Sequence, residues 1–250
     1  MGKIKSILIS QPAPADRSPY HNLATKNNLK IDFRPFIHVE GMPIKEVRKN
    51  RINILDHTAV ILTSKTAADH FFRVSAEMRV NIPDSMKYFC VSQSIANYLQ
   101  KYIVYRKRKI FYGDKTFHSL MSLIRKNNKE KFIVPLSDMH KNEIPNLLEK
   151  HKINYTKAIL YRTVCSDLSD LKDVYYDVLV FFSPTGIKSL FYNFPDFQQN
   201  STKIATFGKS TAQAAKEAGL RIDIEAPLPE APSMVMALDK YISEYNKNNK

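Results

Sequence analysis

Short apolar runs recur along the chain, and most of them are followed by a serine, a threonine or a glycine and then by a stretch with helical periodicity. The runs cover residues 6–10, 59–63, 87–91, 131–135, 177–182 and 203–207. Runs in which apolar and polar residues do not alternate are typical of strands covered on both faces. Between these runs lie amphipathic stretches such as 143–151 and 211–218. The pattern predicts an α/β protein with mostly parallel sheet.

Two of these units resemble each other. AVILTSKTAADHFF (59–72) and DVLVFFSPTGIKSLF (177–191) each read as a strand, a serine, a tight turn and a helix. Any α/β protein contains such units, but the likeness favours two similar lobes. We therefore expect two parallel-sheet α/β lobes in this chain, whose 250 residues are ample for two cores.

Two extended stretches, 31–40 and 157–167, are not followed at once by a strong helix, and we interpret them as strands that cross between the lobes. Crossing twice makes the first lobe discontinuous, and a connection by two strands permits hinge closure around a ligand. The expected parts are a first domain of residues 1–33 and 168–250, a second domain of residues 40–158, and linker strands at 34–39 and 159–167.

The charge of the chain points to an acidic partner. There are 38 Lys and Arg against 24 Asp and Glu, a net charge of +14. Such a field favours a nucleic acid, a membrane surface or an acidic small molecule, although a general preference for lysine gives the same composition. Because the basic residues are spread along the chain, with one basic–aromatic cluster at 102–109, we expect a small molecule and no nucleic acid.

The cysteines, the histidines and the apolar segments argue against a disulfide-rich protein, a metal-binding protein and a membrane protein. Cys90 and Cys165 have no metal-type spacing and make no disulfide framework, and Cys90 lies in an apolar run, which predicts a buried thiol. The seven histidines show no ligand-like pairing, so we expect no metal. The start lacks the apolar stretch of a signal peptide, and no run approaches a membrane span. We expect a cytoplasmic monomer with no cofactor and no membrane association.

The segment IATFGKSTAQAAKEAGL (204–220) contains a turn that looks like the end of a nucleotide-binding loop. A P-loop has a further glycine at the position that Lys203 occupies, so binding of ATP or GTP is a weak interpretation. We expect instead a glycine turn, Ser210 or Thr211 as the cap of an alanine-rich helix, and Gly219 at its end. The free N–H groups of such a helix start form an anion site.

Several short motifs together resemble one known family, uroporphyrinogen-III synthase, over nearly the whole chain. They are, in order, ILISQP, IDFRPF, AVILTSKTAADHFF, ILYRTV, VFFSPTG, TFGKSTAQAAKEAGL and EAPLPEAPSMVMAL. The resemblance implies two α/β lobes joined by a two-stranded β-ladder. It also implies a reaction of tetrapyrrole (heme, siroheme, cobalamin) biosynthesis, in which linear hydroxymethylbilane closes with inversion of its last ring and loss of water. That substrate carries eight carboxylates, and no cofactor takes part.

The same resemblance implies where those carboxylates bind. Turns after the strands present helix N-termini, which attract anions, although each hydroxyl there has an alternative role as an ordinary N-cap. The expected substrate-binding residues are Ser10, Gln11, Ser64, Lys65, Ser92, Ser183, Pro184, Thr185, Gly186, Gly208, Lys209, Ser210 and Thr211.

Tyr161, in ILYRTV, matches the family's tyrosine on the ladder, and we expect it to be the catalytic donor to the departing hydroxyl. The alternative is a tyrosine that only packs. Lys65 and Lys209 stand where the family often has proline, and Ile95 lies near a frequent threonine. The turns of the first lobe, at Ser183, Thr185, Ser210 and Thr211, are therefore better candidates than Ser64 and Ser92.

Two other functions stay open. A two-lobed protein could bind a polycarboxylate at the same helix starts without doing chemistry. The cluster at 102–109 could bind nucleic acid, with an affinity that depends strongly on salt.

Overall fold

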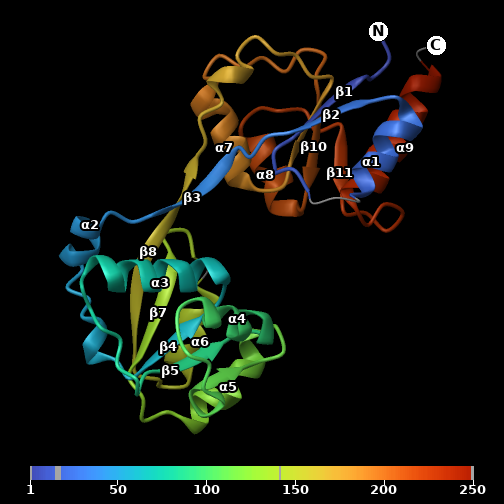
Figure 1. The fold of residues 1–250 in the computed structure, drawn as a ribbon. Coiled ribbons are helices and arrows are strands. Elements are labelled where there is room, and N and C mark those ends of the chain that lie inside the picture. Colours follow the sequence, from blue (N-terminus) through green and yellow to red (C-terminus); the bar gives the residue numbers. More distant parts are fainter. Residues whose placement is uncertain (1, 15–17, 141, 249–250) are drawn as a thin grey trace. The chain divides into compact units, whose positions relative to one another are not determined.

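The computed structural model describes residues 2–14, 18–140 and 142–248. The chain divides into two compact units (Figure 1). Unit 1 combines Met1–His38 with Val164–Lys250, and unit 2 is the segment Val39–Thr163. Unit 1 is therefore discontinuous in the sequence.

Unit 1 is built on a five-stranded sheet with the order β11-β10-β9-β1-β2, and all neighbouring strands in it are parallel. The side chains of its central strand alternate between two cores, since Ile7 and Ile9 pack on one face and Leu8 on the other. The strands are β1 (Ser6–Ile9), β2 (Lys30–Phe33), β9 (Val178–Phe181), β10 (Lys203–Phe207) and β11 (Ile224–Ala226).

Helices cover both faces of this sheet. α1 (Pro19–Asn27) and α9 (Met234–Asn248) supply Leu23 and Leu238 to the core that contains Ile7 and Ile9. α7 (Pro184–Asn193) and α8 (Lys209–Glu217) contribute to the core around Leu8. Burial of both strand faces explains the apolar runs without alternation in the sequence.

Unit 2 has a six-stranded sheet with the order β3-β8-β7-β4-β5-β6. The five strands from β8 to β6 are parallel. The strands are β3 (Ile37–Gly41), β4 (Ala59–Leu62), β5 (Lys87–Cys90), β6 (Ile110–Tyr112), β7 (Phe132–Ser137) and β8 (Tyr155–Cys165). The α-helices are α2 (Ile44–Lys49), α3 (Lys65–Glu77), α4 (Gln93–Tyr98), α5 (Phe117–Lys126) and α6 (Glu143–Lys150).

The helices of unit 2 also lie on two faces. The core with Val47, Phe71 and Ala96 belongs to α2, α3 and α4, whereas Leu120 and Leu148 place α5 and α6 in the other core. Short 3₁₀ turns complete the chain at η1 (Ile54–Asp56), η2 (Leu99–Lys101), η3 (Lys107–Lys109) and η4 (Ser169–Leu171).

The predicted α/β class with parallel sheets is confirmed, and the six apolar runs overlap β1, β4, β5, β7, β9 and β10. The extended stretch at 31–40, which we interpreted as crossing between the lobes, is not one continuous strand. It is divided into β2, which pairs in unit 1, and β3, which lies next to β8 in the sheet of unit 2. Residues 34–36, where a proline cannot donate to a ladder, separate the two. The two-stranded ladder between lobes stays a prediction.

The predicted buried thiol is confirmed, because Cys90 at the end of β5 has no exposed surface. Burial raises the pKa of its thiol to about 12. Cys90 is therefore a packing residue of the unit 2 core.

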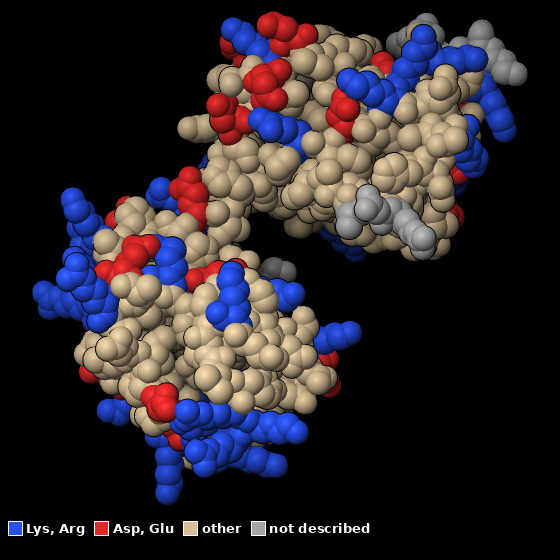
Figure 2. Space-filling view, in the orientation of Figure 1, with Lys and Arg blue, Asp and Glu red and all other residues tan. Residues whose placement is uncertain are grey.

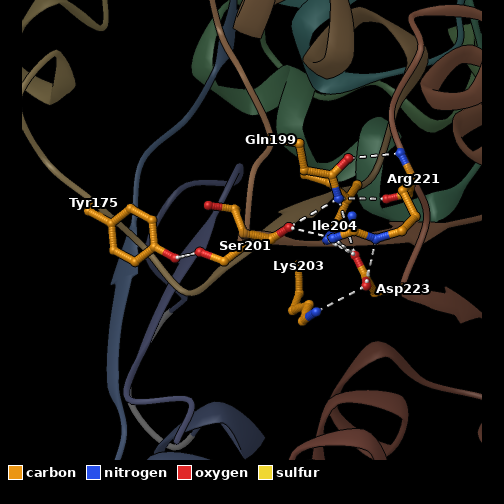
Figure 3. Close-up of polar contacts among 8 residues, drawn as sticks. Tyr175, Gln199, Ser201, Lys203, Ile204, Arg221 and Asp223 are labelled. Atoms are coloured by element: carbon orange, nitrogen blue, oxygen red, sulfur yellow. Dashed lines mark hydrogen bonds and ion pairs between the residues drawn. The ribbon is translucent and has the colours of Figure 1, made fainter. Parts of the chain in front are cut away.

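A buried carboxylate holds the starts of β10 and β11 together in unit 1 (Figure 3). The side chain of Asp223 accepts hydrogen bonds from the Ile204 amide at 3.0 Å and from Gln199 Nε2 at 3.2 Å. Lys203 and Arg221 add charge pairs at 3.5 and 3.2 Å. Because a desolvated carboxylate needs such partners, this network is structural, and it lies at the edge where the strands begin.

Candidate functional site

The carboxyl edge, at which the parallel strands of a sheet end, collects the expected turns of unit 1. After β1 the chain runs through α1 to β2, and after β9 it runs through α7 to β10 on the opposite side. The direction therefore reverses between β1 and β9, and α/β proteins bind ligands at such a switch point. Ser10 and Gln11 follow β1, and Ser183 follows β9 directly across this point.

The turn at Ser183 opens α7 toward Ser10. Ser183 Oγ accepts a hydrogen bond from the Gly186 amide at 3.1 Å, and Pro184 occupies the first turn, where no N–H is needed. A methyl group on Gly186 would lie 3.6 Å from Ser183 Oγ and 3.8 Å from Ser10 Oγ. Gly186 therefore faces both hydroxyls, while Thr185 beside it is half-buried.

The turn at Gly208 corrects the expected cap of α8. The helix begins at Lys209, so neither Ser210 nor Thr211 is its N-cap; Gly208 is, with φ at 89° and no side-chain cap. Only glycine adopts that φ freely. The first N–H groups of α8 consequently have no side-chain acceptor, which is the arrangement that attracts an anion. The predicted end at Gly219 is confirmed, with φ at 78° just after the helix.

Unit 2 repeats the arrangement. From β4 the chain runs through α3 to β5, and it returns through α5 to β7 on the other side of β4, so the switch point lies between β4 and β7. Ser64 follows β4 and caps α3, accepting a hydrogen bond from the Ala67 amide at 2.9 Å. Ser137 and Asp138 come from the end of β7.

Tyr161 lies beside this switch point because β8 carries a bulge. Leu136 pairs with Ile159 but Ser137 pairs with Tyr161, so one extra residue turns the tyrosine toward β4 and α3. Its carbonyl accepts a hydrogen bond from the Asp138 amide at 3.1 Å. Burial raises the pKa of the Tyr161 phenol, and a hydrogen bond with the Ser64 side chain opposes that rise.

α3 packs against this tyrosine. The ring of His70 stacks on the ring of Tyr161, with centroids 5.1 Å apart and an angle of 16° between the planes. Burial and the neighbouring Arg73 charge lower the pKa of His70, against a smaller effect of Asp69. The imidazole is thus held neutral, as stacking on an apolar ring favours.

Arg73 fixes α3 to the two strands that carry Gly41 and Tyr161. Its guanidinium donates to the carbonyls of Met42 and Leu160, both at 3.1 Å, and to His70 Nδ1 at 3.2 Å. It lies directly on Gly41, where an added methyl carbon would come within 2.6 Å of Cζ. Sequence reasoning missed Gly41, His70 and Arg73, since no motif marks contacts between segments this far apart in the chain.

The other two expected residues of unit 2 differ in their surroundings. Lys65 Nζ lies 5.2 Å from the centre of the Tyr98 ring, so a cation–π contact holds its charge at the start of α3. Ser92 caps the six-residue α4 with a hydrogen bond of 3.4 Å from the Ile95 amide. Ser92 and Gly113 also line a cavity of about 890 Å³ at the carboxyl edge.

Two further cavities lie at the opposite edges and contain none of the expected residues. One of about 560 Å³ in unit 1 is lined by Tyr176 and Thr202, which precede β9 and β10. One of about 520 Å³ in unit 2 is lined by Met86 and Lys109, which precede β5 and β6. The carboxyl edge of each sheet is the candidate site because the expected turns follow the strands there.

Among the described residues, no group of three or more His, Cys, Asp or Glu side chains is placed to hold a metal ion. Within the same ranges, no helix has both the length and the apolar character needed to cross a bilayer.

Comparison with known proteins identifies the family. The family model for uroporphyrinogen-III synthase HemD matches residues 18–236. The chain belongs to the uroporphyrinogen-III synthase family. None of the curated protein sequences compared with the chain matches it.

Solved structures agree in fold. The chain is similar to uroporphyrinogen-III synthetase from Helicobacter pylori 26695, with a TM-score of 0.58 and 16% identity over 96% of this chain and 100% of that one. It is also similar to a mutant uroporphyrinogen III synthase from Thermus thermophilus, with a TM-score of 0.50 and 15% identity over 96% and 99%. At these identities the likeness concerns the fold alone.

Proposed function

We propose that this chain converts hydroxymethylbilane to uroporphyrinogen III, with Tyr161 as the donor to the departing hydroxyl and the carboxyl-edge turns as the carboxylate-binding groups. The observation that carries the proposal is the position of the Tyr161 phenol beside Ser64 and the start of α3 at a switch point. Family membership supports the reaction.

Helix starts suit a substrate that is rich in carboxylates. One carboxylate at a helix N-terminus gains about 0.3–1 kcal/mol when exposed and up to about 2 kcal/mol when partly buried. α3, α7 and α8 all begin at carboxyl edges with Ser64, Ser183 and Gly208 as their caps. The α8 start is the strongest candidate of the three, because no side chain of its own already occupies it.

Tyr161 fits the mild acid that this reaction needs. The pyrrole nitrogen of the substrate expels the hydroxyl, and the phenol, which its raised pKa keeps protonated, donates a hydrogen bond to the departing oxygen. The oxygen leaves as water with the proton of the phenol, and the phenolate recovers the proton that the substrate releases after the ring has closed. Catalysis then depends mainly on holding the last ring so that its substituted carbon attacks.

The isomer of the product tests the function. Purified chain mixed with freshly generated hydroxymethylbilane should yield mainly the type III isomer, whereas the substrate alone closes to type I. Chromatography of the oxidised porphyrins separates the two. A mixture identical to the uncatalysed one would refute the proposal and would leave a protein that only binds polycarboxylates, an alternative that no observation here favours.

We propose that the chain acts as a cytoplasmic monomer without a cofactor, and that residues 34–39 and 159–167 link its two domains.

A further inference from the structure

The positive charge of the chain belongs almost entirely to unit 2. That unit has 23 Lys and Arg against 11 Asp and Glu, a net charge of +12, whereas unit 1 has 15 against 13, a net charge of +2. A general preference for lysine would not distinguish two units of similar size. Such an asymmetry indicates that unit 2 meets a polyanion.

Much of this charge lies where the strands of unit 2 begin. In a parallel α/β sheet every helix-to-strand loop returns to that edge. We call the following ten residues of these loops and helix ends the basic edge: Arg79, Lys107, Arg108, Lys109, Arg125, Lys126, Lys129, Lys131, Lys150 and Lys152. All are exposed except Lys109, which is half-buried.

The loops of the basic edge adjoin one another. Tyr88 pairs with Ile110, which puts Lys109 next to the start of β5. The amide of Phe132 donates to the Asn154 carbonyl at 3.0 Å, which brings the loop before β7 beside the loop before β8. A cavity of about 470 Å³ is lined by residues of the α5 and α6 ends, among them Arg125, Lys126 and His151. Figure 2 shows Lys and Arg side chains gathered at this end of the unit.

Acidic side chains do not neutralise this edge. Glu130 pairs with Lys87 at 2.8 Å and Asp84 with Arg106 at 2.9 Å, and neither cation belongs to the ten. Glu149 accepts a hydrogen bond from the Tyr155 hydroxyl at 2.7 Å. Within residues 2–14, 18–140 and 142–248, no carboxylate forms an ion pair with any of the ten.

Helix stability explains only part of the pattern. Arg125, Lys126 and Lys150 lie in the last turns of α5 and α6, where cations interact favourably with the helix dipole. Lys107, Arg108 and Lys109 lie in the single 3₁₀ turn η3, and the residues at 129, 131 and 152 lie in loops, so none of them is in the last turn of an α-helix. The edge is also opposite to the one at which Ser64 and Tyr161 lie, so the proposed substrate site does not account for it.

We propose that the basic edge binds the phosphodiester backbone of a nucleic acid without selecting its sequence. Five parallel strands at about 4.8 Å spacing span about 19 Å, a length over which a duplex presents about 11 phosphate charges. An anionic membrane fits less well, because the exposed large apolar side chains in the loops leading into these strands are Leu55 and Val104, with no aromatic ring to enter the bilayer interface.

The fold explains why the sequence alone favoured a small-molecule partner over a nucleic acid. The basic residues are spread from 79 to 152 in the chain, which argued against nucleic acid. Each strand–helix unit adds only a few of them, but successive units deliver them to the same edge. Separation in the sequence is therefore no measure of separation on this surface.

Fluorescence anisotropy of the full chain with labelled RNA and DNA duplexes tests the proposal. With about five phosphate contacts, the logarithm of the affinity should fall with that of salt concentration at a slope of about −4.5, which is about 500-fold between about 50 and about 200 mM salt. Binding of both duplexes supports a site for the phosphodiester backbone. Tighter binding of one of them would show whether RNA or DNA is the preferred partner.

Neutralised variants locate the site. Lys107→Gln/Arg108→Gln/Lys109→Gln should reduce the magnitude of the slope by about 2–3. Arg125→Gln/Lys126→Gln/Lys129→Gln should also reduce the magnitude of the salt slope, independently of the first variant. The matched control is Lys172→Gln/Lys216→Gln/Lys247→Gln, which removes the same charge from exposed positions of unit 1 and should leave the slope unchanged. Formation of the type III isomer should persist in all three variants.

Three results would overturn the proposal. The first is that neither duplex binds in a salt-dependent way. The second is that the unit 1 control loses as much slope as the unit 2 variants. The third is that the chain binds phosphatidylserine vesicles but neither duplex. The isomer assay is independent of all three, so failure of this proposal would leave the proposed reaction untouched.

Discussion

The ring of Tyr161 in β8 stacks on the ring of His70 in α3, with centroids 5.1 Å apart. The same helix makes a second contact with β8, because Arg73 donates a hydrogen bond to the Leu160 carbonyl at 3.1 Å. A helix that begins at the switch point thus holds the proposed donor by its ring and by its backbone. Replacing these residues separates positioning from chemistry.

Tyr161→Phe should lower turnover about 100-fold, near the lower end of what a positioned acid contributes, because the pyrrole nitrogen already drives the hydroxyl out. Unfolding stability should fall by only about 1 kcal/mol, for one lost hydrogen bond. The matched control is Tyr155→Phe, which removes the hydroxyl bound to Glu149 at the other end of β8. Unchanged turnover in Tyr161→Phe would remove this residue from the mechanism.

Gly41→Ala should destabilise the chain by about 2 kcal/mol. The new methyl would come within 2.6 Å of Arg73 Cζ, so the guanidinium has to move and gives up its bonds to Met42 and Leu160. Denaturant unfolding measures the loss. In an Arg73→Ala background the same methyl should cost nothing, and an additive pair of losses would show that the contact is not the cause.

Gly186→Ala should leave stability unchanged or raise it by up to about 1 kcal/mol. Its methyl meets only ordinary contacts of 3.5 Å or more, and alanine is the better helix former. The same methyl points at Ser10 and Ser183, where we place a substrate carboxylate. KM should therefore rise while the thermal midpoint does not fall, and an unaltered KM would exclude this turn from the binding site.

His70 should make stability depend on pH in the weakly acidic range. Its pKa is lowered in the folded chain, chiefly by burial, so below about 6.5 the unfolded chain binds a proton that the folded chain resists. The contribution of His70 is complete above that pH and declines as the pH falls toward its folded pKa. Thermal midpoints at about pH 7.5 and about pH 5.5 should differ less in His70→Gln than in the parent.

The exposed His118 on α5 supplies the control for that comparison. His118→Gln should retain the full pH dependence of the parent chain. Equal dependence in the parent and in His70→Gln would show that His70 titrates normally.

Much of the fold was predictable because strands buried on both faces leave uninterrupted apolar runs, as at 59–63 and 177–182. Short or polar strands were not predictable in this way. β6 and β11 have three residues each, and β2 and β3 share one stretch that reads as continuous until pairing divides it.

The candidate turns were found from order and spacing, since a serine or glycine after each apolar run must lie at a carboxyl edge. The cap of α8 was assigned wrongly, because the choice between Gly208, Ser210 and Thr211 depends on a backbone angle. The bulge that turns Tyr161 toward α3 likewise comes from strand register.

The sequence by itself determined the class of fold, the family and the turns that carry hydroxyls and glycines, because these follow from local periodicity and from motifs a few residues long. Only the tertiary structure decided that His70, Arg73 and Gly41 surround the strand of Tyr161, and that lysines and arginines dispersed from 79 to 152 share one edge. Contacts of this kind join segments that are remote in the chain, and they exist only after sheet order and strand register have been set.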